Sequence, residues 1–587
     1  MRRLARLIFS SYPVMMPVML VMILFTSIIN ALPSVFIQKI IALININSSY
    51  AAISADIFKY LLILLTLYIL SLIGAFIYSQ LTAFITQGVL KNLRCEMFNK
   101  MQDLPLKYFD AQERGDIMSK FTNDVDALRQ LISQGAPQLL TAFITLSAIL
   151  FIMLYYCLWL TLITLIGVYL MIKITKRVGG RSSKNFVTQQ KNTGKLEGFT
   201  EEILNGQKVV KVIGRETASI LEFNKLNQEL FIEAEKANKR ANTLGPILNN
   251  IGNILYVIMA LAGGLLILFS VPNISLSGLP MSISIIIPFL NMTKQFAGQV
   301  NQLSVQLNSI ISGLAGTGRI FNLIDQAPEL DAGVIELENI KIKGEIKFNH
   351  VSFSYIKDRE ILHDINITAK PGQKIALVGS TGAGKTTVIN LLTRFYDVTQ
   401  GEILYDGINI KQIKKSSLRK NLGMVLQDVN LFTGSVLDNI RYGNLTLTDK
   451  ECVQAAKFAG ADEFINKLNN KYNTLLFNNA ANLSQGQRQL MAIARAAAAN
   501  PPVLILDEAT SSIDTRTELL VQRGMDALIK QNGRTVFIIA HRLSTVRSAD
   551  IILLIEQGRI IEQGTHEQLL NLRGRYYDLY TGAFELK

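Results

Sequence analysis

At 587 residues the chain is too long for one ordinary domain, and its 49% hydrophobic residues make the first half strongly apolar. The net charge of +14 raises the question of nucleic acid, but many lysines and arginines flank long charge-free segments, as in membrane proteins. We therefore expect a lipid bilayer as partner and no nucleic acid. The three isolated cysteines, Cys95, Cys157 and Cys452, have the spacing of neither a metal site nor a disulfide framework.

The first apolar stretch predicts a membrane span. Three arginines within the first six residues are followed by no charge until Lys39, and this run is too long for a signal peptide. We predict a spanning helix near residues 13–33, with its basic flank on the cytoplasmic side. The charge-free run at 60–90 predicts a second span that continues as a cytoplasmic helix.

Two longer runs each predict a pair of spans. Residues 130–172 contain no Asp, Glu, Lys or Arg, and at about 1.5 Å per helical residue they measure roughly 65 Å, twice the hydrocarbon thickness. This segment therefore crosses twice, with a short turn near residues 155–159. Residues 241–293 repeat the arrangement around a turn at 272–280 that contains Pro, Asn and Gly. Six spans result, with both termini in the cytoplasm.

The charged segments between the spans, residues 91–129 and 173–240, lack clusters of Pro and Gly and predict helices that extend from the bilayer. They are either solvated hairpins or arms that contact a cytoplasmic domain. In the sixth span a lysine stands among apolar residues, where it either faces protein or a watery cavity or reaches the inner surface. The candidate substrate-cavity residues, at helical spacing, are Asn291, Lys294, Gln295 and Gln299.

The second half contains a phosphate-binding motif. The apolar run 375–378 predicts a buried strand, residues 388–395 predict a helix, and the loop between them fits G-x-x-x-x-G-K-[ST]. Its glycines let backbone N–H groups point at phosphate oxygens, and the helix that follows adds the positive end of its dipole. The residues of this P-loop are Gly379, Ser380, Thr381, Gly382, Ala383, Gly384, Lys385, Thr386 and Thr387.

Three other apolar runs, 422–426, 503–506 and 535–540, predict further strands of a parallel sheet buried on both faces. Polar residues follow each of them, and they are Gln427, Asp507 with Glu508, and His541. Ligands of open α/β sheets bind at the carboxyl ends of the strands, so four segments converge on one edge. A strand at 351–355 ends in Tyr355, which is either a core aromatic or a platform for adenine.

With the sequence LSQGQ at 483–487 and the loop 511–514, these motifs occur in the order and spacing of the nucleotide-binding domain of ATP-binding cassette (ABC) transporters. Six spans ahead of that domain resemble the exporter half-transporters, and the resemblance covers essentially the whole chain. It implies an α-helical polytopic membrane domain fused to an α/β P-loop NTPase domain. We expect the membrane domain at 1–325, a linker at 326–340 and the nucleotide domain at 341–587.

The resemblance implies ATP and Mg²⁺ as ligands and a role for each matching residue. Glu508 would polarise the attacking water, His541 would hold the γ-phosphate, and Gln427 would sense the metal and signal to the membrane arms. The implied metal ligands are Thr386, Gln427 and Asp507. The implied nucleotide contacts, besides the P-loop and Asp507, are Tyr355, Asp514 and, toward the ATP on a partner's P-loop, Ser484, Gly486 and Gln487.

Two departures from the family pattern bear on the partner. Gln485 stands where the family commonly has glycine, and residues 477–480 read Phe-Asn-Asn-Ala where many exporters have Gly-Glu-Arg-Gly. The side chain at 485 either crowds the γ-phosphate or leans aside. Since Glu508 and His541 are intact, the combination resembles one chain of heterodimeric multidrug exporters, whose other chain carries the degenerate catalytic residues.

The expected function is ATP-driven export of amphipathic compounds, as in multidrug efflux, from a multi-pass position in the cell membrane with the nucleotide domain cytoplasmic. A homodimeric lipid flippase of the same fold is the alternative. A nucleotide-gated regulatory protein or channel is a third hypothesis, against which the catalytic carboxylate Glu508 argues.

Overall fold

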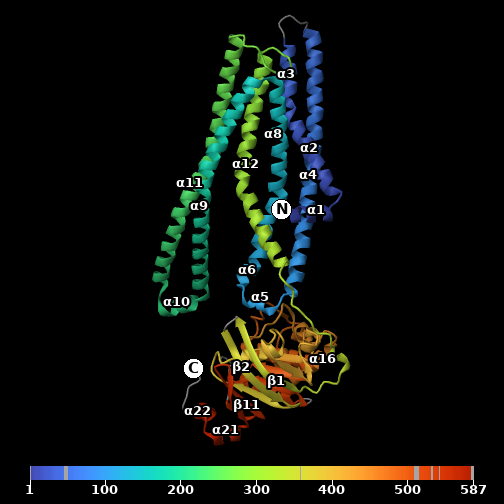
Figure 1. The fold of residues 1–587 in the computed structure, drawn as a ribbon, viewed down its shortest axis with the longest axis vertical. Coiled ribbons are helices and arrows are strands. Elements are labelled where there is room, and N and C mark those ends of the chain that lie inside the picture. The colour runs from blue at the N-terminus through green and yellow to red at the C-terminus, as the bar shows by residue number, and fades with distance from the viewer. Residues whose placement is uncertain are drawn as a thin grey trace. The chain divides into compact units, whose positions relative to one another are not determined.

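The computed structural model describes residues 2–44, 50–356, 359–507, 515–530, 533–540 and 543–582. The chain divides into two compact units, residues 1–103 with 113–326, and residues 104–112 with 327–587. The short segment Leu104–Gln112 therefore groups with the second unit, although the residues on both sides of it belong to the first (Figure 1).

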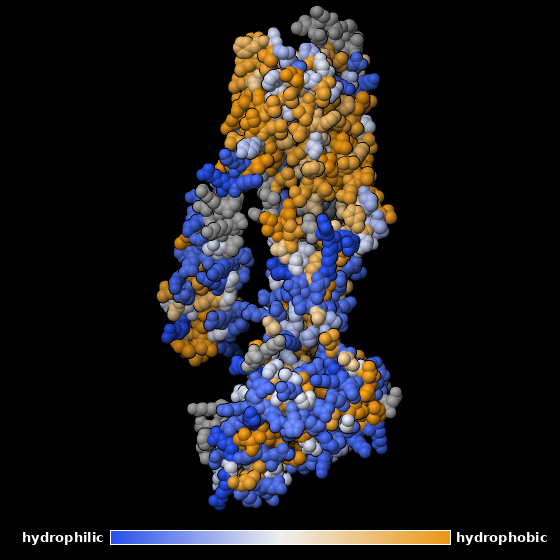
Figure 2. Space-filling model, viewed as in Figure 1, coloured by the Kyte–Doolittle hydropathy of each residue, from blue (hydrophilic) through white to orange (hydrophobic). Residues whose placement is uncertain are grey.

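The first unit is helical. Its elements are α1 (Arg2–Ser11), α2 (Met15–Ala31), α3 (Pro33–Leu43), α4 (Tyr50–Gln102), α6 (Arg114–Ser119), η1 (Lys120–Asp124), α7 (Val125–Gln130), η2 (Leu131–Gly135), α8 (Ala136–Tyr156), α9 (Leu158–Asn205), α10 (Gln207–Ile213), α11 (Glu216–Leu268) and α12 (Ile283–Ile324). The apolar residues of these helices form a continuous band on the surface (Figure 2). The parts that extend beyond this band are mostly hydrophilic, except for exposed apolar residues at the tip around α10.

The turns lie where the charge-free runs predict them. Helix α8 ends at Tyr156 and α9 begins at Leu158, because Cys157 between them has an extended backbone. The loop between α11 and α12 closes this turn: the Asn273 side chain donates to the Tyr156 carbonyl over 2.9 Å, and the Leu158 N–H donates to the Ile274 carbonyl over 2.9 Å. The α8–α9 turn and the α11–α12 loop thus form hydrogen bonds to each other's backbone groups.

Among the described residues, five segments are long and apolar enough to cross a membrane, and they are Met15–Leu43, Ser54–Gln102, Arg114–Tyr156, Leu158–Arg177 and Gly245–Leu268. The sixth predicted span is α12, which is a single helix but is less apolar than these five segments. Asn291, Lys294 and Gln295 interrupt its apolar sequence. Helix α12 is thus suited to a position shielded from lipid rather than surrounded by it.

The second unit contains α5 (Leu106–Asp110), two larger sheets and a two-stranded sheet. Its strands are β1 (Ile346–Ile356), β2 (Arg359–Ala369), β3 (Lys374–Val378), β4 (Gln400–Tyr405), β5 (Ile408–Asn409), β6 (Leu422–Val425), β7 (Gly434–Ser435), β8 (Leu475–Leu476), β9 (Val503–Asp507), β10 (Thr535–Ile539), β11 (Ile551–Glu556) and β12 (Arg559–Gly564). The strand orders are β2-β1-β4-β5, antiparallel, then β12-β11-β3-β10-β9-β6, and β7-β8.

Helices flank these sheets, and they are α13 (Lys385–Leu392), α14 (Lys415–Lys420), α15 (Val436–Arg441), α16 (Asp449–Phe458), α17 (Asp462–Ile465), α18 (Gln485–Ala499), α19 (Thr515–Lys530), α20 (Leu543–Arg547), α21 (His566–Leu572) and α22 (Arg575–Thr581), with short 3-10 turns η3 (Leu337–Asn339) and η4 (Lys471–Asn473). Alternate residues of β3 enter two different cores: Ile375 and Leu377 pack in one, Ala376 and Val378 in the other. Burial on both faces explains the unbroken apolar run.

Candidate nucleotide-binding site

Four parallel strands bring the predicted segments to one edge of the six-stranded sheet. Strand β10 lies between β3 and β9, with Ile539 opposite both Leu377 and Asp507, and β6 pairs with the far side of β9. Because all four strands run in the same direction, the loops that follow them leave from the same edge. The P-loop, Gln427 and Asp507 therefore emerge at this common edge.

The P-loop conformation depends on its glycines. Gly379, Gly382 and Gly384 have φ angles of +153°, +82° and +110°, which other residues rarely adopt. A Cβ at Gly379 would also lie 2.1 Å from the carbonyl oxygen of Ile555. Helix α13 begins at Lys385, within the motif, and no side chain among the described residues caps its first turn, so the N–H groups there can face a bound anion.

Lys385, the first residue of α13, is a buried cation held by its own loop. Its Nζ donates to the carbonyl oxygens of Gly379 over 2.6 Å and Ser380 over 2.8 Å. Burial lowers the pKa of Lys385, and the negative charge of Asp507 at the end of β9 partly opposes this effect. The loop thus positions a positive charge in a place where a phosphate would compensate its desolvation. These features fit a triphosphate.

The two threonines that follow occupy different environments. Thr386 is exposed at the sheet edge, which is the placement that a metal-binding hydroxyl requires. Thr387 is buried, and its Oγ1 accepts a hydrogen bond from the Tyr355 hydroxyl over 3.3 Å. Thr387 therefore supports the site from beneath in this structure.

Tyr355 lies at the end of β1 within a cluster of aromatic rings. Its ring makes edge contacts with Phe353 and Tyr396, with centroid distances of 4.7 and 4.9 Å. Its hydroxyl also accepts from Asn390 Nδ2 of α13 over 3.3 Å. Tyr355 is thus bound to the P-loop helix as part of a half-buried aromatic cluster, and its stacking on adenine stays a prediction.

The predicted signature residues form the start of α18. Ser484 is the N-cap: its side chain accepts from the Gln487 N–H over 3.3 Å, and the Gln487 side chain accepts from the Ser484 N–H over 2.9 Å. This reciprocal arrangement fixes the helix start. Gly486 is buried, whereas the Gln485 side chain is exposed on the first turn. The predicted contact of this turn with a partner's ATP stays a prediction.

The loop before the signature contains three consecutive left-handed residues, Asn478, Asn479 and Ala480, with φ of +47°, +54° and +54°. Asn tolerates this conformation better than most residues. The Asn479 side chain accepts from the Leu431 N–H over 2.7 Å, so it connects this loop to the segment that follows Gln427. Sequence reasoning missed this contact, although the Asn-Asn pair is a signal for left-handed backbone.

Gln427 itself is exposed two residues beyond the end of β6. Glu508, His541 and Asp514 lie outside the described residues. Their predicted roles rest on the sequence alone. For Glu508, the structure shows only that the preceding residue, Asp507, ends strand β9.

A residue that sequence reasoning missed connects α5 to the aromatic cluster. The Tyr396 hydroxyl donates to Asp110 over 2.5 Å, and both residues belong to the second unit. Burial and the Asp110 carboxylate both raise the pKa of Tyr396, so this tyrosine remains neutral. Because the ring of Tyr396 contacts Tyr355, a continuous set of contacts runs from α5 to the P-loop helix.

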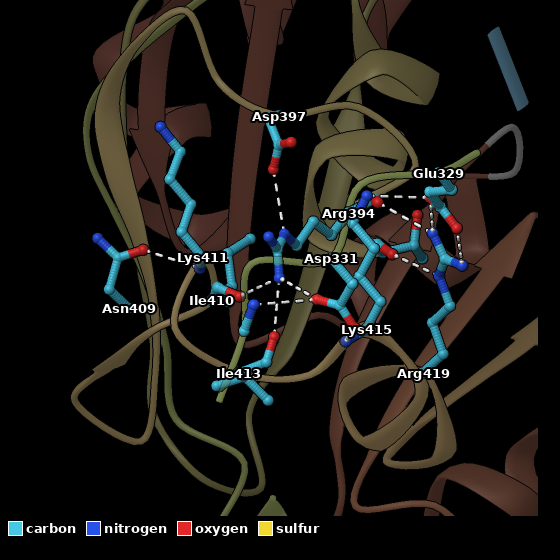
Figure 3. A network of polar contacts seen from close by, with 12 residues as sticks. Glu329, Asp331, Arg394, Asp397, Asn409, Ile410, Lys411, Ile413, Lys415 and Arg419 are labelled. Carbon is cyan, nitrogen blue, oxygen red and sulfur yellow. Dashed lines mark hydrogen bonds and ion pairs between the residues drawn. The ribbon is translucent and has the colours of Figure 1, made fainter. Parts of the chain in front are cut away.

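The opposite end of α13 is bound to the linker (Figure 3). Arg394, two residues past the helix, is buried; its Nη1 donates to the carbonyl oxygens of Ile410 and Ile413 over 3.0 and 2.8 Å and lies 3.5 Å from the Asp331 carboxylate. Nearby, Glu329 accepts from both Lys415 and Arg419. The linker is therefore attached to the nucleotide unit by charged groups from two sides.

The predicted cavity residues divide into two groups along α12. Asn291 and Lys294 are exposed, and within the described part of the chain Lys294 has no hydrogen bond or ion pair. Gln295 instead donates to the Asn30 carbonyl of α2 over 2.9 Å, and Gln299 is half-buried. Only the first pair, together with Gly298, forms a freely exposed polar face.

Known proteins share this arrangement. Residues 16–292 match the ABC transporter transmembrane region, and residues 362–511 match the ABC transporter family. The chain is 39% identical over 525 residues to the fatty acid ABC transporter ATP-binding/permease protein of Mycobacterium bovis, which covers 89% of this chain and 81% of that protein. It is 33% identical over 537 residues to the ATP-dependent lipid A-core flippase of Legionella pneumophila, and this alignment covers 91% of this chain and 89% of that protein.

A solved structure of a bacterial Atm1-family ABC exporter with ATP bound has a TM-score of 0.80 at 26% identity, covering 98% of this chain and 100% of that chain. The fold and the site define a multi-pass membrane protein whose ATPase activity is coupled to transport. The chain belongs to the ABC transporter family, as an exporter half-transporter in which a membrane domain is fused to an ATP-binding domain.

Proposed function

We propose that the protein exports amphipathic molecules that carry a negative charge, using ATP hydrolysis at the edge of the six-stranded sheet. The observation that carries this proposal is the exposed polar face of α12, with Lys294 lacking a counterion among the described residues. A lone cation within a membrane span is costly unless it contacts water or an anion. An anionic headgroup supplies that partner, while its chain remains in apolar surroundings. The relatives named for a fatty acid and for lipid A-core are consistent with this class.

On the nucleotide side, Lys385 and the N–H groups at the start of α13 would hold the phosphates. Thr386, Asp507 and Gln427 are the groups available to Mg²⁺, which when bound neutralises charge on the phosphates. Glu508 would orient the attacking water and His541 would hold the γ-phosphate. Phosphoryl transfer depends mainly on such positioning and charge compensation.

The contact between Asp110 and Tyr396 supports a route for coupling within the nucleotide unit. A change in the position of Tyr355 on nucleotide binding would move Tyr396, and through it α5. Helix α5 is continuous in sequence with α4 and α6 of the membrane unit. The nucleotide unit would lie in the cytoplasm of a cell-membrane protein.

The assembly would contain two half-transporters. The exposed Gln485 and the altered loop at 477–480 support an unlike partner, so that this chain's P-loop forms the active site and its own signature serves a weaker site. In that case Glu508→Gln would abolish nearly all turnover of the complex. A residual activity of about half would indicate two equivalent sites, as in a homodimeric flippase.

The experiment is ATP-dependent accumulation of fluorescent amphiphiles in inside-out membrane vesicles that contain the complete transporter. Accumulation above the Glu508→Gln variant is expected for anionic amphiphiles of the lipid and drug-like classes. Equal signal in wild type and Glu508→Gln vesicles would contradict the proposal. Accumulation of cationic dyes in preference to anionic ones would favour multidrug efflux of the broader kind over the charge-selective export proposed here.

A further inference from the structure

A cavity of about 310 Å³ lies beneath the first helix of the membrane unit. It is lined by α1, α2, α4, η2 and α8 and is partly open to the surface, and its walls are almost entirely apolar. The side chains that face it include Leu4, Ile8, Met19, Ile85 and Leu140. An apolar cavity of roughly 150 Å³ is large enough for benzene, so this one has room for a segment of an alkyl chain.

Two polar side chains, Arg2 and Thr82, line this cavity. The Thr82 hydroxyl already donates to the Tyr78 carbonyl over 2.7 Å and lies 3.2 Å from the sulfur of Met19. Arg2 has no hydrogen bond or ion pair with any residue that the structure describes. The cavity therefore offers an apolar interior and one cation without a partner.

Helix α1 as a whole also carries an excess of positive charge. The helix carries three arginines and no acid. Arg3 is compensated, because it donates to the Asp325 carboxylate over 2.5 and 2.7 Å and lies over the Phe321 ring. Arg2 and Arg6 remain, one helical turn apart, so that both can face one ligand.

The residues of the cavity wall lie at the predicted inner end of a charge-free run, where we expect hydrocarbon and headgroups to meet. The wall includes Leu131, the second residue of the charge-free run 130–172, and the last charge before this run is Arg129, paired with Asp126. An amphipathic basic helix at this level attracts anionic lipids of the inner leaflet.

We propose that this cavity is a binding site for an anionic phospholipid, with one acyl chain in the cavity and the phosphate on Arg2. Arg2 and Arg6, both unpaired within the described part of the chain, fit a phosphodiester headgroup, whose oxygens can accept from both. The lipid would be a resident component that fixes α1 against α2, α4 and α8. This site is separate from the polar face of α12, so the proposal does not depend on the proposed substrate.

The test uses the full chain, purified in detergent, depleted of lipid and titrated with phosphatidylglycerol, phosphatidylcholine or palmitate. Bound lipid is counted by native mass spectrometry, and thermal unfolding is followed in parallel. The wild type should retain phosphatidylglycerol at least about tenfold more tightly than phosphatidylcholine, and palmitate should not displace it. Retention should be the same in the Glu508→Gln variant.

Two pairs of variants distinguish lipid binding in the cavity from the general effects of losing a positive charge or adding a tryptophan. Arg2→Gln should lose the preference for phosphatidylglycerol, whereas Arg177→Gln, the same change of charge at the end of another span, should keep it. Ala5→Trp, which fills the cavity, should lose phosphatidylglycerol, whereas Ser10→Trp on the same helix should keep it. Equal retention within either pair would overturn the proposal, as would equal binding of phosphatidylcholine or displacement by palmitate.

Discussion

Two lysines, one in each unit, show opposite ways of keeping a cation in an apolar setting. Lys385 is buried at the start of α13, and two carbonyl oxygens of its own loop accept from its Nζ. Lys294 stands on an exposed face of α12 and has no partner in the described part of the chain. Hydrogen bonds within the fold thus compensate the charge of Lys385 without a ligand.

Lys294 has no compensating group among the described residues, so under the proposed function its charge meets a group from elsewhere. In a membrane-spanning helix such a group is water, a partner subunit or a transported anion. The nucleotide site is thus preorganised, whereas the proposed transport site has no compensating charge among the described residues. Substitutions at the two lysines should therefore have different effects on ATP hydrolysis and on transport.

The largest expected effect is at the preorganised site. Lys385→Met removes the only side-chain cation of the P-loop, so ATP hydrolysis should fall by about 100-fold or more. Phosphate release by the reconstituted transporter measures it. Lys294→Met is the matched control, and its hydrolysis without substrate should stay within about twofold of wild type. If both variants lost ATPase activity alike, the separation between the two lysines would fail.

At the incomplete site the expected effect concerns transport. Lys294→Met should reduce the ATP-dependent uptake of a labelled fatty acid about tenfold, because one charge-assisted contact is lost. Lys294→Arg should keep most of the uptake. A neutral alcohol of the same chain length should be unaffected by either change. Unchanged fatty acid uptake in Lys294→Met would exclude the proposed counterion role.

The lowered pKa of Lys385 predicts a pH dependence of nucleotide binding. Burial makes this lysine lose its proton below the ordinary value of about 10.4, and the protonated form attracts phosphate. ATP affinity should therefore be complete near neutral pH and fall several-fold as pH rises from 8 toward 10. The stability of the unliganded protein changes in the opposite sense, because there the unfolded chain binds more protons.

Equilibrium binding of ATP and of AMP over this pH range measures the effect. AMP lacks the phosphates that Lys385 would contact, so its affinity should change less. Parallel pH profiles for the two nucleotides would show that Lys385 does not contact the β and γ phosphates.

A smaller effect is expected at the contact between α5 and the nucleotide site. Tyr396→Phe removes the hydrogen bond to Asp110, so the stimulation of ATPase activity by substrate should fall about two- to threefold, with basal activity kept. Combining it with Asp110→Asn should add no further loss, because both changes remove one interaction. Additive losses would indicate that the two residues act separately.

The smallest effect is expected in the linker network. Glu329→Gln weakens the contacts with Lys415 and Arg419, and about 1 kcal/mol of stability should be lost. Although burial opposes it, hydrogen bonds from these two residues lower the pKa of Glu329, so its contribution is present above pH 5 and is lost as the pH falls through the lowered pKa.

Thermal unfolding of the full chain measures this change. Glu338→Gln, in the exposed pair with Lys420, is the control and should change the midpoint little. Equal shifts in the two variants would assign the effect to net charge rather than to the linker.

Local patterns predicted much of this molecule. The charge-free run at 130–172 predicted a turn that lies at Cys157, and four apolar runs ending in polar residues predicted a common sheet edge. These predictions succeed because burial and backbone direction leave periodic and compositional signals in the sequence.

Contacts between distant residues could not be predicted in this way. Asp110 and Tyr396 are 286 positions apart, and nothing in the sequence near either residue indicates the other as its partner. Arg394 is a charged residue that is 3% exposed, because carbonyl oxygens of another segment surround it. Such contacts depend on tertiary packing, which no local pattern records.

If ATP held at Lys385 drives an anionic amphiphile past Lys294, transport must depend both on ATP hydrolysis and on the negative charge of the substrate. The most direct test compares ATP-dependent accumulation of a labelled fatty acid and of its neutral alcohol in inside-out vesicles containing the complete transporter. We expect accumulation of the acid in preference to the alcohol, none with Glu508→Gln, and loss of the preference with Lys294→Met. Equal accumulation of acid and alcohol by the wild type, or accumulation that persists with Glu508→Gln, would contradict the proposed function.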